Sequence, residues 1–369
     1  MKKQITCSIC GAILTEENVH EFNGQLICGD CFDEQTIECE CCHERIWRED
    51  AEMDNQTTLC KDCFDDYYTT CEMCGRIINR DYAYYKEDCD DPYCQHCFNK
   101  LEEKPIKSYG YKPEPIFHGS GDLFYGVELE IDRGGDFDSN AEILLNIANS
   151  NGEHMYCKHD GSITSGFEMV SHPMSLDYHT NDMDWLKIFN KAVELGYRSH
   201  NTTTCGLHVH VNRSAFGKTH DEQEDVISRI VYFVEAHWNE LLKFSRRTEI
   251  NIMRWASRYG IAENAKLTYD KAKKKSGMGR YVAVNLANYK TIEFRIFRGT
   301  LRYKTFIAAL QLVDEICRLA AIFDDKTFEG MPWSDFVANI SKKNKPELIE
   351  YLKSKRLYVN EEITEMEEV

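Results

Sequence analysis

The chain has 369 residues, of which 42% are hydrophobic and 29% are charged, and its formal net charge is −18. This length exceeds the roughly 100 to 200 residues of one domain, and the mixed composition is typical of folded globular proteins rather than disordered ones. The negative charge argues against a nucleic-acid partner, because binding to phosphates requires clustered Lys and Arg. The sequence contains no apolar run of about 20 residues that would cross a membrane.

The first residues predict a cytoplasmic location. Lys2 and Lys3 are followed by a cysteine at position 7, instead of the apolar stretch of about 7 to 15 residues that a signal peptide requires. The 17 cysteines therefore indicate metal ligands in a reducing compartment more than disulfide bonds of a secreted scaffold.

Residues 1–98 contain one cysteine motif three times. In each copy a C-x2-C pair is followed 17 or 19 residues later by a second pair, and the first cysteines of successive copies are 32 residues apart. Four sulfurs arranged in this way can close a tetrahedral zinc shell that leaves no position for a substrate. We predict three treble-clef-like modules, at 1–36, 37–68 and 69–98, each folded around one structural Zn²⁺. The predicted ligands are Cys7, Cys10, Cys28, Cys31, Cys39, Cys42, Cys60, Cys63, Cys71, Cys74, Cys94 and Cys97.

Two alternatives to these zinc sites stay open. The cysteines could be reduced buried thiols, which is the interpretation we give to Cys157, Cys205 and Cys317. A neighbouring side chain could also replace one ligand within a module. The candidates for such an exchange are Cys41, His43, Cys89 and His96.

The zinc modules are strongly acidic. Residues 1–100 contain 9 Lys and Arg against 22 Asp and Glu, which leaves a net charge of −13. A rigid acidic array suits a basic protein surface. We therefore expect the modules to dock a peptide or protein substrate, or another protein partner, and not DNA.

The prolines of residues 99–121 predict a linker, because proline fits neither helix interiors nor central strands. A second domain is predicted at 122–325. A helical C-terminal extension follows at 326–369 and ends in an acidic tail that is expected to be solvated. The acids of this tail are Glu361, Glu362, Glu365, Glu367 and Glu368.

Three segments of the second domain alternate apolar and charged residues with the period of a β-strand: 125–132, 207–211 and 291–298. Their charged or titratable residues are Glu128 and Glu130, then His208 and His210, and then Glu293 and Arg295. Each set alone could lie on the solvent-exposed face of an antiparallel sheet. Together they place like charges so close that a cation is needed between them, and they predict a face that binds a divalent ion and phosphate. A helix from about Tyr303 to Phe323 is apolar enough to cover the opposite face.

Three further signals are weaker. Asp160 and Glu168 could reach the same site from a hairpin, although Asp-Gly is foremost a turn dipeptide. Arg280 lies at the start of another alternating segment, 279–286. It could contribute to the site, or it could be a salt-bridged residue at the rim. Residues 271–279 are rich in Lys and Gly and predict either a lid over phosphates or a solvated charge run.

The order of these motifs resembles the amidoligase family, whose members are frequent in bacterial and bacteriophage genomes. The motifs that carry the resemblance are 126–130, Asp160 to Glu168, 206–211 and 291–295, and the resemblance spans residues 122–322. The family belongs to the carboxylate-amine ligase superfamily, together with glutamine synthetase. The resemblance implies an α+β fold with a curved antiparallel sheet of glutamine synthetase-like type. It also implies that ATP and Mg²⁺ are bound, that a substrate carboxylate is phosphorylated and that an amine displaces the phosphate.

The resemblance also implies roles for individual residues. The implied Mg²⁺ ligands are Glu128, Glu130, Glu168, His208 and Glu293. His210 and Arg295 are implied contacts to ATP or to the transferred phosphate, and Arg298, Arg280 and Asp160 are further catalytic candidates. His172 stands before Pro173 where relatives tend to have a small residue, a departure on the substrate side of the site.

Three functions follow from these observations. The first is an ATP-dependent ligase that forms an amide or isopeptide bond, with a peptide or protein among its candidate substrates. The second is a zinc hydrolase that uses the imidazoles of His208 and His210. The third is a non-catalytic zinc-finger adaptor, which the intact set of charged residues disfavours.

Overall fold

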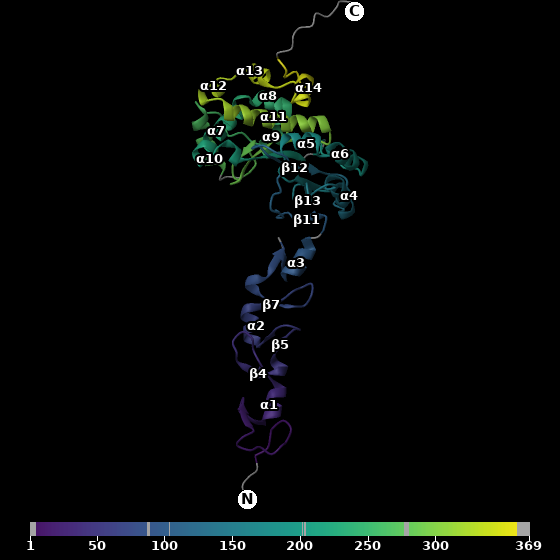
Figure 1. Ribbon diagram of the computed structural model, residues 1–369, viewed down its shortest axis with the longest axis vertical. Coiled ribbons are helices and arrows are strands. Elements are labelled where there is room, and N and C mark those ends of the chain that lie inside the picture. Colours follow the sequence, from purple (N-terminus) through teal and green to yellow (C-terminus); the bar gives the residue numbers. More distant parts are fainter. Residues whose placement is uncertain are drawn as a thin grey trace, which may run out of the picture. The chain divides into compact units, whose positions relative to one another are not determined.

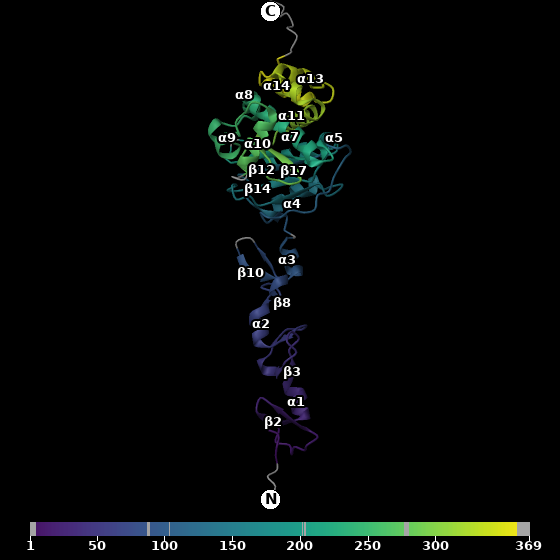
Figure 2. The same ribbon diagram turned by 90° about the vertical axis from the view of Figure 1, so that its left-hand side faces the viewer.

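The computed structural model describes residues 5–86, 89–102, 104–200, 202, 204–276 and 280–359. The chain separates into two compact units, Met1–Lys104 and Pro105–Val369, which are drawn in Figures 1 and 2. The predicted acidic tail from Glu361 onward lies outside the described residues. No helix in the described part of the chain is both long and apolar enough to cross a membrane.

The first unit contains three copies of one small fold. In each copy the first cysteine pair lies in a tight hairpin, a second hairpin leads to the second pair, and a short helix follows. The elements of the first copy are β1 (Val19–Phe22), β2 (Gln25–Cys28) and α1 (Gly29–Gln35). Those of the second are β3 (Thr36–Glu38), β4 (Arg45–Trp47), η1 (Arg48–Asp50), β5 (Glu52–Met53), β6 (Thr58–Leu59) and α2 (Lys61–Tyr67). Those of the third are β7 (Tyr68–Thr70), β8 (Ile77–Asn79), η2 (Arg80–Tyr82), β9 (Tyr84–Lys86), β10 (Cys89–Tyr93) and α3 (Gln95–Glu102).

The turn after the first cysteine pair is the same in all three copies. Gly11, His43 and Gly75 have left-handed φ angles of 75°, 62° and 70°. Their N–H groups donate to the carbonyls of the first cysteines, each at 2.9 Å. Glycine adopts this backbone without a steric penalty, so His43 is the exception among the three.

Apolar residues of one copy complete the small core of the preceding copy. The ring of Trp47 lies 4.9 Å from that of Phe22, between centroids, and Ile77 joins the buried cluster of Leu59. The Ile77 N–H also donates to a carboxylate oxygen of Asp54 at 2.7 Å. A unit of about 30 residues has too little apolar volume for a core of its own, so these shared contacts stabilise the array.

A seven-stranded sheet lies at the centre of the second unit. Its strand order is β11-β13-β14-β12-β15-β17-β16, and neighbours are antiparallel except for β11 and β13. The strands are β11 (Ile106–Lys107), β12 (Tyr125–Ile131), β13 (Met155–Lys158), β14 (Phe167–Ser171), β15 (Gly206–Asn212), β16 (Val284–Asn285) and β17 (Thr291–Arg298). The strands predicted at 125–132, 207–211 and 291–298 are therefore confirmed.

One face of this sheet is apolar and is covered by a long helix, α11 (Tyr303–Ile322). Val127, Leu129 and Val209 are fully buried in the same cluster as the apolar side of this helix. The hydroxyl of Tyr125 donates to Asp314 of α11 at 2.7 Å. The predicted helix from Tyr303 to Phe323 is thus confirmed, and α11 lies on one side of the sheet (Figure 1).

The remaining helices surround this core. They are α4 (Asp138–Ala148), α5 (Leu176–Asn181), α6 (Trp185–Glu194), η3 (Arg213–Phe216), α7 (His220–Ala236), α8 (Trp238–Ser245), α9 (Glu249–Trp255), α10 (Ala265–Ser276), α12 (Asp325–Glu329), α13 (Trp333–Asn339) and α14 (Pro346–Ser354). The C-terminal helices belong to the same unit as the sheet. Phe336 and Leu348 are buried in the main cluster, and Lys345 pairs with Asp314 and Glu315 of α11.

Part of the predicted linker belongs to the sheet. Ile106 and Lys107 form β11, which pairs with β13, and the Ile116 N–H donates to His172 Nδ1 at 3.2 Å. The prolines of this segment prevent ladder hydrogen bonds only at their own positions, so the residues between Pro105 and Pro113 remain free to pair.

Two expectations about residues 260–286 can be compared with the structure. Residues 265–276 form α10, which packs against α7 with Lys273 Nζ 2.8 Å from Glu224 Oε1. The segment predicted as a lid or a solvated charge run, 271–279, is therefore helical as far as residue 276, with Lys273, Lys274 and Lys275 exposed, and residues 277–279 lie outside the described part. Arg280 does not open a strand, because Val282 bridges to Ser257 and only Val284–Asn285 joins the sheet as β16.

Candidate functional site

The register of the central strands places the predicted charged residues on one face. β12 lies between β14 and β15, and β17 follows β15. The directly opposed pairs are Glu130 and Glu168, Glu128 and His208, and His210 and Glu293. Because opposed side chains point to the same side of a sheet, these six residues share the face that α11 does not cover. We call it the polar face.

Two overlapping groups of atoms on the polar face are close enough to hold a cation. Glu128, Glu168 and His208 offer ligand atoms within 4.8 Å of one another, and so do Glu128, His210 and Glu293. Glu128 joins the groups, with one oxygen 3.3 Å from His208 Nδ1 and the other 3.3 Å from His210 Nε2. Carboxylate oxygens with an imidazole nitrogen form a donor set suited to divalent ions.

Glu130 and Asp160 lie at one end of this face, and each has an oxygen bound within the protein. Glu130 Oε2 accepts from the Gly206 N–H at 2.5 Å, and Asp160 Oδ1 accepts from the Ser162 N–H at 2.7 Å. Burial raises the pKa of Glu130, and the charge of Asp160 adds to this increase. Asp160 therefore lies near the carboxylates, and one of its oxygens stabilises a turn.

Crowding of charge shifts the pKa values of the carboxyl groups in opposite directions. Burial, followed by the charge of Glu128, raises the pKa of Glu168 well above its usual range. Burial also opposes ionisation of Glu128, but His210 and His208 hold its pKa well below that range. For Glu293 burial is again outweighed, chiefly by His210, and its pKa is lowered. Buried carboxylates in such numbers repel one another, and a divalent cation between them would remove that repulsion.

Two residues to which sequence reasoning gave no role complete the polar face. Lys158 Nζ lies 3.2 Å from Glu168 Oε2, and the residue is buried. Asn285 Nδ2 donates to Glu293 Oε2 at 2.8 Å. Lys158 is opposite Glu168 in the β13–β14 ladder, so the period of the predicted hairpin could have identified it. Asn285 precedes a loop and has no comparable signal.

The predicted arginines occupy different environments. Arg295 is buried and pairs with Glu293, and its guanidinium lies 5.8 Å from the ring of Tyr281. Arg280 is exposed and stacks over Tyr109 at 5.8 Å and over Tyr281 at 5.6 Å. The structure therefore joins Arg295 directly to the carboxylates, whereas Arg280 contacts an aromatic rim.

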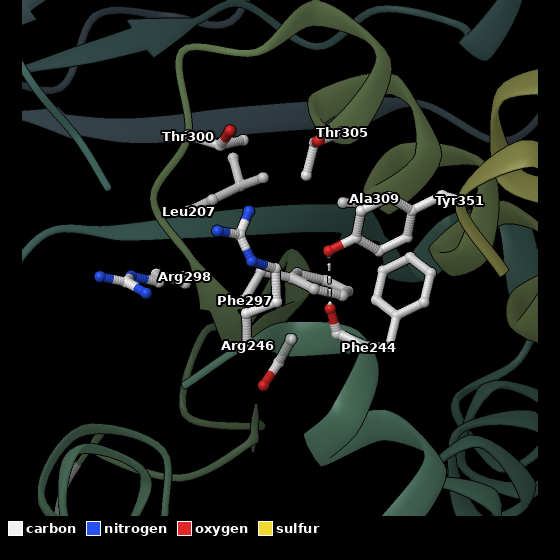
Figure 3. A pocket seen from close by; sticks show the side chains of 10 residues that line it. Leu207, Phe244, Arg246, Phe297, Arg298, Thr300, Thr305, Ala309 and Tyr351 are labelled. Carbon is white, nitrogen blue, oxygen red and sulfur yellow. Dashed lines mark hydrogen bonds between the residues drawn. The ribbon is translucent and has the colours of Figure 1, made fainter. Parts of the chain in front are cut away.

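Arg298 ends β17 and lines a cavity beside Arg246. Figure 3 shows the two guanidinium groups among the side chains of this cavity, where the Tyr351 hydroxyl donates to the Phe244 carbonyl at 3.1 Å. Burial and the charge of Arg246 lower the pKa of Arg298. Sequence reasoning missed Arg246 because it follows α8, in a left-handed turn with φ of 61°, and no strand pattern points to it.

The twelve predicted zinc ligands converge in three groups of four sulfurs, each within 4.8 Å of one another. The distances between sulfurs of the two pairs include 3.7 Å for Cys10 and Cys28, and 3.9 Å for both Cys42 with Cys60 and Cys74 with Cys94. A tetrahedron with Zn–S bonds of about 2.3 Å has edges of about 3.8 Å. Each group can therefore hold one zinc ion.

The first thiol of each module has a pKa lowered to about 6. For Cys7 the backbone N–H of Cys10 is the main cause. For Cys39 and Cys71 burial acts against ionisation, but backbone N–H groups of the two cysteine pairs outweigh it. These N–H groups favour the thiolate, which is the form that binds zinc.

Of the alternative ligands whose side chains the structure describes, none is a member of the three groups of four cysteines. His43 Nδ1 lies 3.0 Å from Glu38 Oε1, and the side chains of His43 and His96 are exposed. Cys41 packs against the apolar cluster of the second module. The side chain of Cys89 lies outside the described part of the chain.

Comparison with known proteins adds evidence for the second unit. No curated protein matches the chain. Residues 146–317 match the family model described as "Putative amidoligase enzyme". This range contains β13, β14, β15, β16 and β17, but it does not contain β12 or the zinc modules. The match supports a ligase-type enzyme in the second unit.

Proposed function

We propose that this protein is an ATP- and Mg²⁺-dependent carboxylate-amine ligase with a sheet of glutamine synthetase-like type. The observation that carries the proposal is the polar face, where two groups of carboxylates and imidazoles share Glu128 and where Arg295 pairs with Glu293. The amidoligase match over residues 146–317 supports the same class of reaction.

The reaction would proceed in two steps. An oxygen of the substrate carboxylate attacks the γ-phosphorus of ATP, a new O–P bond forms, the bond to the bridging oxygen breaks and ADP leaves. The nitrogen of a neutral amine then attacks the acyl carbon. The C–N bond forms, the C–O bond to phosphate breaks, inorganic phosphate leaves and the nitrogen releases one proton.

The donor set of the polar face fits Mg²⁺ because most of its ligands are oxygens. Glu128, Glu168 and Glu293 would hold the ions, with His208 and Glu130 completing the set. When bound, Mg²⁺ would neutralise phosphate oxygens and so assist transfer of the phosphoryl group.

The other residues would bind and orient the nucleotide. Arg295 and His210 would contact the transferred phosphate, and both lie beside Glu293. A buried guanidinium can stabilise the charge that develops on the phosphoryl oxygens. Asp160, Arg280 and Arg298 would act from the edges of the face.

The test uses the full-length protein with ATP, Mg²⁺ and pooled carboxylic acids and amines. We expect release of ADP together with an equal amount of an amide product. Glu128→Gln should lower the rate by roughly 10- to 100-fold or more, because it weakens both metal groups. Glu142→Gln, an exposed residue of α4, is the control with the same change of charge. Nucleotide binding without any ADP release, or an unchanged rate in Glu128→Gln, would contradict the proposal.

A zinc hydrolase is distinguished in the same assay. His208 and His210 belong to two different groups that share a carboxylate, an arrangement that favours two oxygen-rich sites. Activity that persists without nucleotide and disappears with a chelator would support the hydrolase instead.

A further inference from the structure

A segment that precedes β12 is fixed at both ends but forms no helix or strand of its own. At one end Lys107 belongs to β11, which pairs with β13. At the other end the His118 N–H donates to the Pro173 carbonyl at 3.0 Å. Residues 108–115 lie between these ends without regular secondary structure, and we call them the strap. The strap lies outside the residues that match the amidoligase family.

One part of the strap contacts the β13 end of the polar face. The ring of Tyr111 meets that of Tyr156 edge to face, with 5.3 Å between the centroids. Tyr156 and Lys158 are two residues apart in β13 and therefore point to the same side of the sheet. Burial raises the pKa of Tyr156, and the charges of Glu128 and Glu168 add to this increase, although Lys158 opposes it. The Tyr156 hydroxyl thus lies near both carboxylates.

Another part of the strap contacts residues at the β17 end of this face. The guanidinium of Arg280 lies 5.8 Å from the ring of Tyr109 and 5.6 Å from that of Tyr281. The ring of Tyr281 in turn lies 5.8 Å from the guanidinium of Arg295 in β17. We call Tyr109, Arg280 and Tyr281 the clasp.

These contacts place the strap over the polar face. β13 and β17 are separated by three strands, which corresponds to about 19 Å at about 4.8 Å per strand. Tyr109 and Tyr111 are two residues apart in the chain, so their Cα atoms are separated by at most about 7 Å. They can contact residues from both ends only where segments from the two ends meet over the strands between them.

The carboxylates on those strands are largely buried. The side chains of Glu168 and Glu293 are 3% and 4% exposed, and that of Glu128 is 22% exposed. A metal ion that carries a nucleotide must approach carboxylate oxygens to within about 2.1 Å. A nucleotide can therefore reach these groups only after part of their cover has moved.

The clasp is the weakest part of this cover. All three of its residues are exposed, and a guanidinium over an exposed ring shifts an equilibrium by only roughly two- to fivefold. The ends of the strap are held more firmly, because the hydrogen bonds of β11 and His118 belong to the backbone.

We propose that the strap is a lid that the clasp holds closed over the polar face, and that the closed strap and a bound nucleotide exclude each other. Opening of the clasp would then admit ATP and its metal ions. The inference rests on the proposed ligase function and adds the step by which the nucleotide enters.

The first experiment measures access to the polar face without nucleotide. Diethyl pyrocarbonate, which acylates imidazoles, is added to the full-length protein, and modification of His210 and His220 is followed by peptide mass spectrometry. His210 lies on the polar face, whereas the side chain of His220 is 69% exposed and serves as the internal reference. A covered group is modified only while its cover is open, so the rate at His210 follows the open fraction.

Two variants and one control test the clasp. Tyr109→Ala should speed modification of His210 by roughly two- to fivefold and leave His220 unchanged. Arg280→Gln should act in the same way, and the double variant should not exceed the single ones, because the two residues form one contact. Tyr289→Ala removes a ring that is 89% exposed and should leave both rates unchanged. Thermal unfolding checks the fold of each variant.

The second experiment measures the affinity for a non-hydrolysable ATP analogue, adenylyl imidodiphosphate, with Mg²⁺. A closed lid lowers the apparent affinity, so Tyr109→Ala should tighten binding by about the factor by which it speeds modification. Weaker binding in Tyr109→Ala would make Tyr109 a nucleotide contact and overturn the proposal. Equal modification of His210 in Tyr109→Ala and in the unaltered protein would overturn it as well.

The two experiments separate this inference from the proposed function. Faster modification of His210 in Tyr109→Ala, without nucleotide binding or ATP turnover in any variant, would retain the lid and remove the ligase. ATP turnover together with unchanged modification of His210 in Tyr109→Ala would retain the ligase and remove the lid.

Discussion

His179 of α5 shows how one buried residue makes the second unit sensitive to pH. Its Nε2–H donates to the carbonyl of Tyr125 at 2.8 Å, and its Nδ1 accepts from the indole N–H of Trp185 at 3.2 Å. The bond from Trp185 requires the neutral imidazole, because a protonated Nδ1 cannot accept, whereas the bond to Tyr125 can form in either protonation state. Burial lowers the pKa of His179 from 6.5 to about 4, although the bond to Tyr125 acts in the opposite direction.

This lowered pKa predicts a loss of stability in mild acid. Above pH 6.5 both folded and unfolded chains hold a neutral His179, and its contribution is complete. As the pH falls from 6.5 to about 4, the unfolded chain takes up the proton first, and the free energy of unfolding decreases by about 3 kcal/mol at most. Urea unfolding across this range, followed by tryptophan fluorescence, should show a shallower decrease in His179→Gln. An unchanged decrease would contradict the prediction, and the exposed His220→Gln serves as control.

At the scale of the element, the turns after the first cysteine pair have the same backbone conformation in all three zinc modules, although their sequences differ. Gly11 and Gly75 supply the left-handed residue in two copies, whereas the second copy uses His43. The bond of His43 to Glu38 is exposed and contributes little. The second turn is therefore the strained one of the three.

His43→Gly should stabilise the second module. The substitution removes the strain of the left-handed backbone, but glycine also has greater freedom in the unfolded chain. The expected net increase in the free energy of unfolding is up to about 1 kcal/mol. Competition with a chelator should require a higher chelator concentration to remove zinc from this module. Glu44→Gly, one residue later, where the Glu44 carbonyl accepts from the Cys39 N–H at 2.9 Å, should lower that concentration, and equal effects of the two changes would refute this explanation.

The docking of the C-terminal helices depends on a buried ion cluster. Lys345 pairs with Asp314 and Glu315, and all three residues are buried. Lys345→Met would leave two carboxylates together in the interior, which should cost about 3 to 5 kcal/mol. The midpoint of urea unfolding should fall accordingly, and the double variant with Glu315→Gln should recover part of the loss. A double variant no more stable than Lys345→Met would show that charge is not the cause.

At the scale of the whole molecule, the two units derive their stability from different sources. The first unit has small clusters built around cysteine sulfurs, whereas the second has one large apolar core. The first unit is also strongly acidic. That a basic protein partner docks on it remains a prediction.

Removal of zinc should therefore affect the first unit alone. A chelator should release three zinc ions per chain, one from each group of four cysteines, and circular dichroism should show partial loss of structure. Cys39→Ser should reduce the zinc content to two ions, and Cys41→Ser should leave it at three. Loss of zinc in Cys41→Ser, or complete unfolding of the chain on chelation, would contradict this division.

The sequence by itself determined the zinc modules and the three charged strands. A repeated C-x2-C spacing and a period of two are local properties, and local geometry alone decides which way those side chains point. Glu128, His208 and Glu293 could therefore be placed on one face, and α11 could be expected over the other.

Only the tertiary structure decided which of these residues share an ion and what surrounds them. The opposition of Glu130 and Glu168 depends on strand order and register, which pair residues 38 positions apart in the chain. Arg246 lines its cavity from a turn after α8, where no period exists to be recognised. This cavity arises where that turn meets residues of β15 and β17, such as Leu207 and Arg298, because contacts between distant segments are a property of the folded chain alone.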